Sequence, residues 1–407
     1  MRAFIAVGLL TLTASTAAAG DGTWLPLASL AIARQETGAA TIGGEVYVAG
    51  GLLAGNPLHA TASVEVYDIA NDAWRFGVNL PVALDHMAVA AAGGRLFVIG
   101  GYSGDFSPRN TVWIFDPADS SWAPGEPIPA PRGAAWAVAH SGRIFLFGGI
   151  GAGGTVTRTT FIYDPVADQW SQGRDMPTAR EHLNAVAAGN FIYVIGGRAG
   201  ASTGANERYD PVADQWAPMA PMPAPRSAVA AGALGGIIYA AGGEVPMLFA
   251  VNEAYDIAHN TWSTAQPMAV PRHGVAAVSL GDRLFAPGGG TVQGLAPTTH
   301  VDAFRPSVVS VEETPAAAGP LLGLPAPNPC TAATNVAVTL RNQAQVRVVI
   351  ADAMGRTIRI LADDARAVGS YSYPWDLRDG RGRQVPAGVY WIRLVGSGPT
   401  RKLVVAN

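Results

Sequence analysis

The octet YDPVADQW occurs twice in this sequence, as Tyr163–Trp170 and again, letter for letter, as Tyr209–Trp216. Proline presets the backbone for a turn and aspartate hydrogen-bonds to nearby backbone, so DPVAD is typical of a tight hairpin turn. Identical copies a few tens of residues apart indicate a protein built from repeated supersecondary units. The octet therefore predicts a repeat architecture made of β-strands.

The same pattern extends in both directions from the octet. An aromatic residue followed by aspartate recurs at Tyr67, Phe115, Tyr163, Tyr209 and Tyr255. A tryptophan stands seven residues after each of these aromatics, at Trp74, Trp122, Trp170, Trp216 and Trp262. Six glycine pairs close apolar runs in the same order, at Gly50-Gly51, Gly100-Gly101, Gly148-Gly149, Gly196-Gly197, Gly242-Gly243 and Gly288-Gly289. The constant order indicates six copies of one unit.

Each unit contains four short runs rich in Val, Ile, Tyr and Phe and bounded by Gly, Pro, Asn and Asp, which is typical of strands. A glycine pair allows positive φ and leaves room for the aromatic side chains to lie against backbone. Six four-stranded units with glycine pair, aromatic-Asp and Trp in fixed order resemble kelch repeats. The resemblance covers residues from about 22 to 306 and implies a six-bladed β-propeller.

The two ends of the repeat region carry complementary halves of one unit. Trp24 has no glycine pair or Tyr-Asp before it, whereas the last unit has Phe304 but no tryptophan seven residues later. We therefore expect the segment around Trp24 to supply the outer strand of the last blade, which would remove a free sheet edge.

The repeat ends at Pro306, and a stretch rich in Ala, Pro and Gly predicts a linker over 307–326. Residues 327–407 alternate strand-like runs with Gly and Asp turns, the pattern of a small β-sandwich. The PNP at Pro327, the ADAMGR turn, WDLRDGRGRQVPAGVY and the final RKLVV resemble the immunoglobulin-like domain of flagellar hook-capping proteins. They also resemble C-terminal sorting domains of the type IX secretion system. The expected fold class is all-β: a six-bladed kelch-type propeller over 20–306, then this sandwich.

Composition and targeting signals bear on the location and partners of the chain. Residues 1–19 combine an arginine, an apolar run and small residues before a cleavage point, as a secretory signal peptide does. We expect an exported protein, secreted or at the cell surface, or periplasmic if the sorting interpretation fails. A net charge of −3 gives no reason to expect nucleic acid, and no long apolar segment predicts a membrane span. The single cysteine, Cys330, excludes an intrachain disulfide and cysteine-rich metal sites.

Charged residues recur by blade at the start of the innermost strands. These are Arg34, Arg132, Arg180, Arg226 and Arg272, with Asp85 in the matching place of the second unit. Converging guanidiniums would suit a ligand carboxylate, although arginines that belong to the repeat can equally hydrogen-bond neighbouring carbonyls. His86, His182 and His273 fall near the same opening. Loops after the glycine pairs carry a mixture of aromatic and charged side chains: Tyr102, Asp105, Phe106, Arg109, Arg158, Arg198, Glu244 and Phe249.

No recurring catalytic set, cofactor motif or local metal-ligand spacing is present, so we predict no catalytic residues, no cofactor and no metal. The function favoured is a binding module for glycan or protein, using the arginines together with Arg198, Glu244, His182 and His273. Its C-terminal domain would engage the secretion machinery. Kelch-like propellers also include copper sugar oxidases and sialic-acid mutarotases. The oxidases need a Cys cross-linked to a Tyr, and the repeat region here has no cysteine. A mutarotase is the alternative function, with Glu244 and Arg198 as its acting residues. A purely structural surface protein is the third alternative.

Overall fold

In the computed structural model the chain divides into two compact units, Met1–Val309 and Ser310–Asn407. The described residues are 22–55, 59–307, 321–323, 325–340, 343–352, 356–394 and 400–406. The predicted signal peptide and residues 308–320 of the predicted linker lie outside this set. No helix among the described residues is long and apolar enough to cross a membrane.

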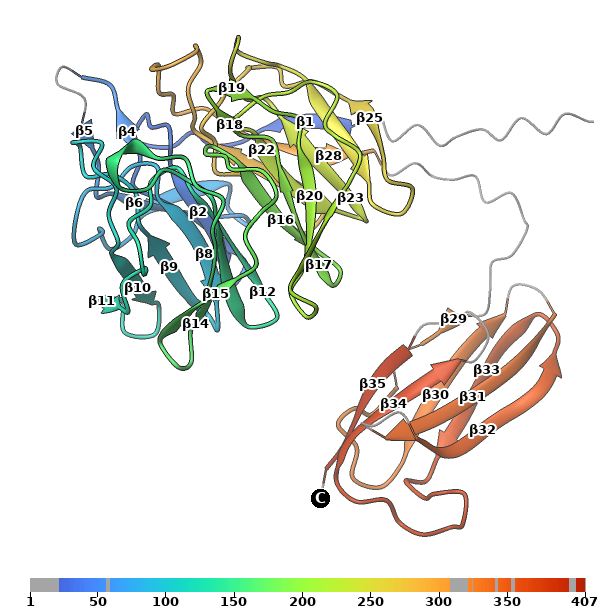
Figure 1. The fold of residues 1–407 in the computed structure, drawn as a ribbon. Helices are drawn as coiled ribbons and strands as arrows, with labels where there is room; N and C mark the ends of the chain where they lie inside the picture. Colours follow the sequence, from blue (N-terminus) through green and yellow to red (C-terminus); the bar gives the residue numbers. More distant parts are fainter. Residues whose placement is uncertain are drawn as a thin grey trace, which may run out of the picture. The chain divides into compact units, whose positions relative to one another are not determined.

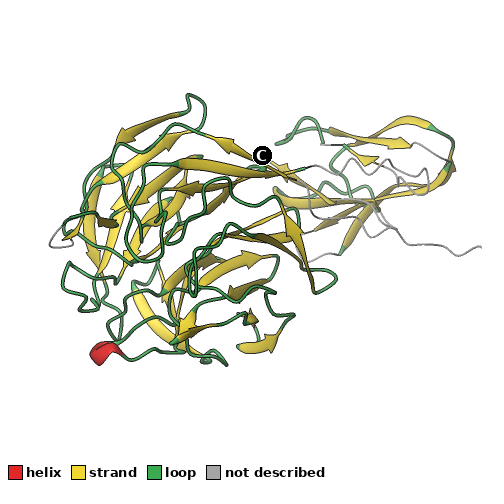
Figure 2. Cartoon of the chain, turned by 90° about the horizontal axis from the view of Figure 1, so that it is seen from above, coloured by secondary structure: helices red, strands yellow, loops and turns green. Residues whose placement is uncertain are grey.

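The first unit is a β-propeller of six four-stranded antiparallel sheets, which confirms the predicted fold class (Figures 1 and 2). The innermost strands of neighbouring blades contact one another around a closed ring. Blade one has β2 (Gly38–Ile42), β3 (Glu45–Ala49), β6 (Val64–Asp68) and β7 (Ala73–Phe76). Blade two has β8 (Ala88–Ala92), β9 (Arg95–Ile99), β10 (Val112–Asp116) and β11 (Ser121–Gly125). Blade three has β12 (Trp136–His140), β13 (Arg143–Phe147), β14 (Thr160–Asp164) and β15 (Gln169–Gly173).

The remaining blades repeat this order of strands. Blade four has β16 (Asn184–Ala188), β17 (Phe191–Ile195), β20 (Asn206–Asp210) and β21 (Gln215–Pro218). Blade five has β22 (Ala230–Leu234), β23 (Ile237–Ala241), β24 (Asn252–Asp256) and β25 (Thr261–Ala265). Short elements decorate the loops: β4 (Leu52–Leu53) with β5 (His59–Ala60), β18 (Arg198–Ala199) with β19 (Ala201–Ser202), and the 3₁₀ turn Ala152–Gly154.

Blade six is assembled from both ends of the repeat region. Its strands are β26 (Val278–Leu280), β27 (Arg283–Pro287), β28 (Val301–Pro306) and, outermost, β1 (Gly22–Pro26). Trp24 pairs with Phe304 across the two outer strands, with ring centroids 5.3 Å apart. Its indole Nε1 donates to the Gln266 carbonyl at 2.9 Å. The N-terminal strand therefore covers the edge that β28 would otherwise expose.

The repeated octet joins each blade to the one before it. In blade four, Asp214 accepts hydrogen bonds from the Tyr209 hydroxyl and from the Arg174 backbone N–H, both at 2.7 Å. Trp216 Nε1 donates to the carbonyl of the same Arg174 at 2.9 Å. In blades one, three and five the equivalent two side chains likewise bind the N–H and the carbonyl of a single residue, which is Ala28, Glu126 or Ala220. The octet is thus copied because each blade has to be fastened to its neighbour in the same way.

The second unit is a two-sheet β-sandwich with an immunoglobulin-like arrangement. One sheet has the order β29 (Leu321–Leu322), β30 (Thr334–Leu340), β33 (Gly369–Trp375). The other has β32 (Thr357–Arg366), β31 (Ala344–Asp352), β34 (Gly388–Leu394), β35 (Thr400–Val405). Its core gathers Trp375, fully buried, with the free Cys330 among the aliphatic side chains.

Candidate functional site

Three consecutive residues lead into the innermost strand of every blade, and we call these segments the axial turns. They are residues 34–36, 84–86, 132–134, 180–182, 226–228 and 272–274. The third residue of each turn has a positive φ, between 47° at His182 and 59° at Gly274. Each third residue donates its N–H to the carbonyl of the third residue in a neighbouring blade, at 2.8 to 3.1 Å. Six such bonds close a ring, so the backbone fixes six side-chain positions around the axis.

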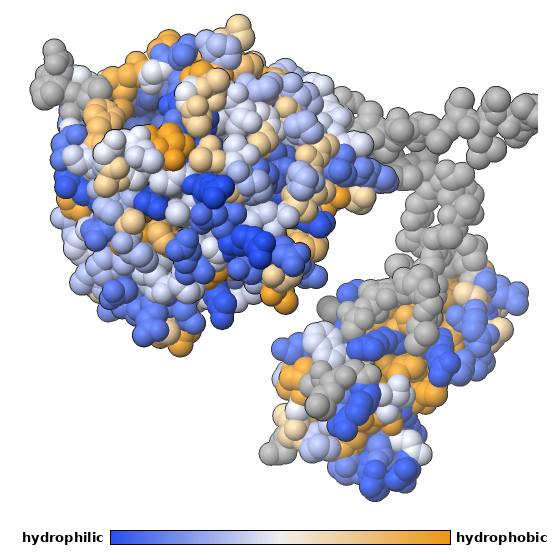
Figure 3. Space-filling view, viewed as in Figure 1, coloured by the Kyte–Doolittle hydropathy of each residue, from blue (hydrophilic) through white to orange (hydrophobic). Residues whose placement is uncertain are grey.

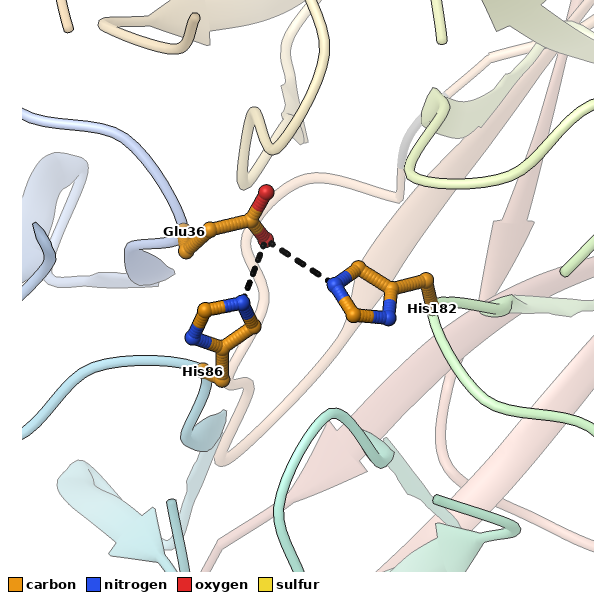
Figure 4. A group of neighbouring side chains, drawn as sticks. All are labelled: Glu36, His86 and His182. Carbon is orange, nitrogen blue, oxygen red and sulfur yellow. Dashed lines mark ion pairs between the residues drawn. The ribbon is translucent and has the colours of Figure 1, made fainter. Parts of the chain in front are cut away.

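Only three of these six third positions carry long polar side chains: Glu36, His86 and His182 (Figure 4). The Nε2 atoms of both histidines lie 3.8 Å from the same carboxylate oxygen, Oε2 of Glu36. The other three positions are Ala134, Ala228 and Gly274, whose small size leaves a cavity of about 40 Å³ beside the polar groups. We call Glu36, His86 and His182 the axial cluster.

Gly274 makes room for the carboxylate of Glu36. A Cβ atom at Gly274 would lie 2.3 Å from Glu36 Oε1, so any larger residue there would displace the carboxylate. On the same side, His273 approaches Glu36 Oε1 with its Nδ1 at 3.4 Å. That Nδ1 atom is buried and has no hydrogen-bond partner among the described residues, while Nε2 lies 3.0 Å from the Val292 carbonyl. Glu36 is therefore surrounded by imidazoles from three blades.

A further layer of acidic groups stands behind the histidines. His86 Nδ1 lies 2.5 Å from Asp85, and His182 Nδ1 contacts Glu181. Arg198 links this layer to blade five, with Nε donating to Glu181 at 2.6 Å and Nη1 donating to Glu244 at 2.8 Å. A carboxylate on the far nitrogen orients an imidazole and directs Nε2 toward the axis.

The charges of the axial cluster shift the pKa values of its members in different directions. Burial raises the pKa of the Glu36 carboxyl, but the three neighbouring histidines outweigh burial and hold that pKa well below its usual range. Burial lowers the pKa of His86, yet the Glu36 charge and the Asp85 hydrogen bond raise it above the ordinary value. Burial depresses the pKa of His182 strongly, against the attraction of Glu36. The two histidines that face one carboxylate therefore have pKa values shifted in opposite directions.

The predicted arginine site requires a correction. Four of the five arginines, Arg34, Arg180, Arg226 and Arg272, are fully buried. Each is ion-paired with an acid on the third strand of its own blade, namely Glu65, Glu207, Glu253 and Asp302. Arg132 instead donates to Thr159 at 2.6 Å and lies over the ring of Phe161 at 5.1 Å. A ligand carboxylate could reach these guanidiniums only by displacing their partners, so the proposed site omits them.

In blade two, the position equivalent to the arginines is held by Leu84. Asp85, which the sequence predicted there, is the second residue of that axial turn. Of the other predicted residues, Arg198, Glu244, His182 and His273 do meet at the axis. Glu36 and Glu181 were missed because they follow an arginine that dominates the repeat pattern. Aligning the axial turns would have found Glu36, since the second and third positions both vary from blade to blade, with acid, imidazole and small residues among them, whereas the first is arginine in five of six.

The fold, the repeat and the ring together define the class of protein. The family model for the KLHDC2/KLHL20/DRC7 kelch-repeats domain matches residues 36–243, and a kelch motif matches residues 225–269. The chain belongs to the kelch-repeat proteins. The model for the FlgD Ig-like domain matches residues 330–399.

Similar proteins agree with this fold. Kelch-like protein 35 of Homo sapiens is 39% identical over 79 residues, which are 19% of this chain and 13% of that protein. The structure of YjhT matches with a TM-score of 0.60 and 18% identity, covering 68% of this chain and 95% of that one. At that identity the likeness shows the propeller fold alone.

Proposed function

We propose that this chain is an exported binding module whose ligand, a glycan or a protein segment, docks on the loops around the axial turns. One observation carries the proposal: three loops that contact the buried polar groups at the axis, through Phe106, Glu244 and Val292, also carry exposed apolar side chains. Phe106, Met247 and Val292 lie in three different loops and are 55%, 59% and 50% exposed. On the face of the propeller drawn in Figure 3, apolar residues lie scattered among hydrophilic ones.

The chemistry of these loops suits recognition of polar or aromatic-stacking ligands. Phe106 lies against Tyr102 with ring centroids 5.7 Å apart, and Tyr102 lies against His86 at 5.3 Å. Asp105 and Arg109 pair at 2.8 Å beside them. Aromatic faces next to charged groups are typical of sites that bind sugars or peptide side chains, because stacking and hydrogen bonding act together.

The binding test compares the two ends of the propeller. Full-length protein is screened on a glycan array and on a peptide library, and hits are measured again with Phe106→Ser together with Met247→Ser. We expect affinity to fall at least tenfold, which corresponds to about 1.4 kcal/mol. Val166 and Val212, 95% and 93% exposed in hairpin turns at the opposite strand ends, supply the matched control. Equal losses from Val166→Ser and Val212→Ser would contradict a loop-face site.

Export and delivery form the second part of the proposal. The residues 1–19 have the composition of a secretory signal, and the C-terminal sandwich belongs with immunoglobulin-like domains that the sorting domains resemble. Deleting residues 322–407 in a host with a type IX system should leave the propeller in the periplasm, as measured by cell fractionation. Normal surface delivery of that truncated chain would reduce the sandwich to a structural domain.

A mutarotase remains the alternative, and Arg198 with Glu244 would have to act in it. Arg198 is held by both Glu181 and Glu244, so binding a sugar carboxylate requires exchange of at least one of these partners. These two ion pairs occupy the Arg198 guanidinium, which favours binding over catalysis. Following anomer interconversion of sialic acid by NMR, with and without the protein, distinguishes the two functions.

A further inference from the structure

We propose that the axial cluster is a binding site for a divalent transition-metal ion of the zinc class, held by Glu36 Oε2, His86 Nε2 and His182 Nε2. These donor atoms all lie within 4.8 Å of one another, and they come from blades one, two and four (Figure 4). No local sequence spacing links them, since each lies in a different repeat. The site is independent of the loop-face binding proposed above.

The geometry is close to what such an ion requires. A tetrahedral zinc ion bound at about 2.1 Å holds its ligand atoms about 3.4 Å apart. The separation of 3.8 Å between Glu36 Oε2 and each histidine Nε2 is only a few tenths of an ångström larger. Because the ring of backbone hydrogen bonds fixes all three residues, a small rotation of the side chains would complete the coordination.

The surrounding groups form the outer layer that metal-binding histidines need. Asp85 and Glu181 contact the Nδ1 atoms of His86 and His182, which turns each ring so that Nε2 faces Glu36. A cation between the three residues would accept the Nε2 lone pairs and the carboxylate charge, in place of the protons that otherwise lie between an imidazole and a carboxylate.

The balance of buried charge also favours a dication. Four buried carboxylates and one partly buried guanidinium meet at this end of the axis: Glu36, Asp85, Glu181 and Glu244, with Arg198. The neighbouring imidazoles offset the remaining negative charge only when they hold protons, which a bound dication would replace. His273, which is 1% exposed, brings its Nδ1 to 3.4 Å from Glu36 Oε1 and to 3.6 Å from Glu244 Oε2. His273 would hold Glu36 in place once Oε2 is engaged by metal.

The size of the neighbouring cavity decides what else could bind. A water molecule needs about 10 to 15 Å³ of such space, so about 40 Å³ holds an ion with two or three waters and excludes a sugar ring. Three protein ligands leave coordination positions open toward Ala134 and Ala228. Two imidazoles and one carboxylate suit Zn²⁺, whereas Ca²⁺ and Mg²⁺ prefer oxygen ligands.

The test uses the full-length chain, freed of metal by chelator dialysis. Zn²⁺ is titrated by calorimetry and bound zinc is counted by mass spectrometry; we expect one zinc per chain. Glu36→Gln and His182→Ala should each weaken zinc binding at least a hundredfold. Asp85→Asn, which keeps all three ligands, should weaken it about ten- to hundredfold. Co²⁺ should give a visible absorption band in the wild type that these ligand variants lose.

His259→Ala is the matched control, because His259 pairs with Asp256 at 2.8 Å on the surface and no third ligand joins them among the residues that the structure describes. It should bind zinc as the wild type does. Thermal unfolding without metal shows which variants fold; if His182→Ala does not fold, Glu36→Gln and the Co²⁺ spectrum decide. No zinc uptake by the wild type, or undiminished uptake by folded Glu36→Gln, would mean an ion-paired cluster only and would overturn the proposal.

Discussion

The first residue and the third residue of an axial turn lie two positions apart, yet their side chains enter different surroundings. In blade four, Arg180 turns into its own sheet and pairs with Glu207 at 2.6 Å. His182 turns to the axis and meets Glu36 from blade one. The first position thus serves contacts within a blade, and the third serves contacts between blades.

The two positions also vary differently from blade to blade. The first position follows the third strand of the same blade: arginine where that strand offers Glu65, Glu207, Glu253 or Asp302, and arginine over Phe161 in blade three. In blade two it is Leu84, which packs in the same apolar cluster as Trp113. The third position has no such partner on the third strand; His86 and His182 instead contact the acid that precedes them and Glu36 from blade one. A residue that pairs with the third strand of its own blade is constrained by that pairing. A residue without such a pairing can differ between blades and contribute to a binding site.

Opening the propeller is the most drastic way to disturb both positions. A chain lacking Gly22–Pro26 loses the Trp24–Phe304 contact and exposes the edge of β28. We expect the free energy of unfolding to fall by more than about 5 kcal/mol, since a buried aromatic contact and a set of strand hydrogen bonds are lost together. Chemical denaturation measures this, and gel filtration should reveal association. Trp24→Phe, which keeps the strand, is the control; unchanged stability of the deletion would refute closure by β1.

The buried arginine pair comes next in size. Arg226→Leu leaves Glu253 buried without its partner, which typically costs about 3 to 5 kcal/mol. Arg226→Leu combined with Glu253→Trp copies the apolar pair of blade two and should recover most of that loss. Urea denaturation of the three proteins gives the comparison. A double variant as unstable as the single one would show that the arginine does more than neutralise its own blade.

A glycine substitution at the third position of an axial turn should keep or raise the free energy of unfolding, in contrast to the loss expected at the first position. Ala134 has φ of 51°, a conformation that costs an alanine about 1 kcal/mol and costs glycine nothing. Ala134→Gly should therefore keep the stability or raise it by up to about 1 kcal/mol. Ala135→Gly, at the next residue and outside the left-handed region, should lower stability by about 0.5 to 1 kcal/mol. Equal destabilisation by both changes would remove the backbone argument for the ring.

The outer hairpins should show the smallest effect, and it depends on pH. Hydrogen bonds from the Ala28 backbone and Tyr67 lower the pKa of Asp72, and those from Arg174 and Tyr209 outweigh burial to lower the pKa of Asp214. A lowered folded pKa gives stability that is complete above the ordinary aspartate pKa, about 4, and is lost as pH falls below it.

Asp72→Asn with Asp214→Asn should remove this acid-dependent part and keep the hydrogen bonds. Asn260 already makes the same bonds in blade five, to Tyr255 and Ala220 at 2.8 Å. Melting temperatures at pH 7 and pH 3 should therefore differ less in the double variant than in the wild type. A larger difference in the variant would contradict the assigned direction.

The sequence by itself determined the architecture of this protein. Glycine pairs, aromatic-Asp pairs and tryptophans at constant spacing predicted six blades, because each blade solves the same local packing problem with the same residues. The turn chemistry of DPVAD and the apolar strands are likewise properties of short segments. A sandwich after the repeats followed from strand-like runs between turns in the same way.

Only the tertiary structure decided which charged residues face the axis. The arginines stood out in the sequence because they recur, but four of the five recur because each pairs with an acid on the third strand of its own blade. Glu36, His86 and His182 are separated by 50 to 146 positions and become neighbours only when the ring closes. Side-chain direction depends on the backbone ring and on positive φ at the third position, and neither of these is visible from local spacing; six separate turns had to meet before a site existed.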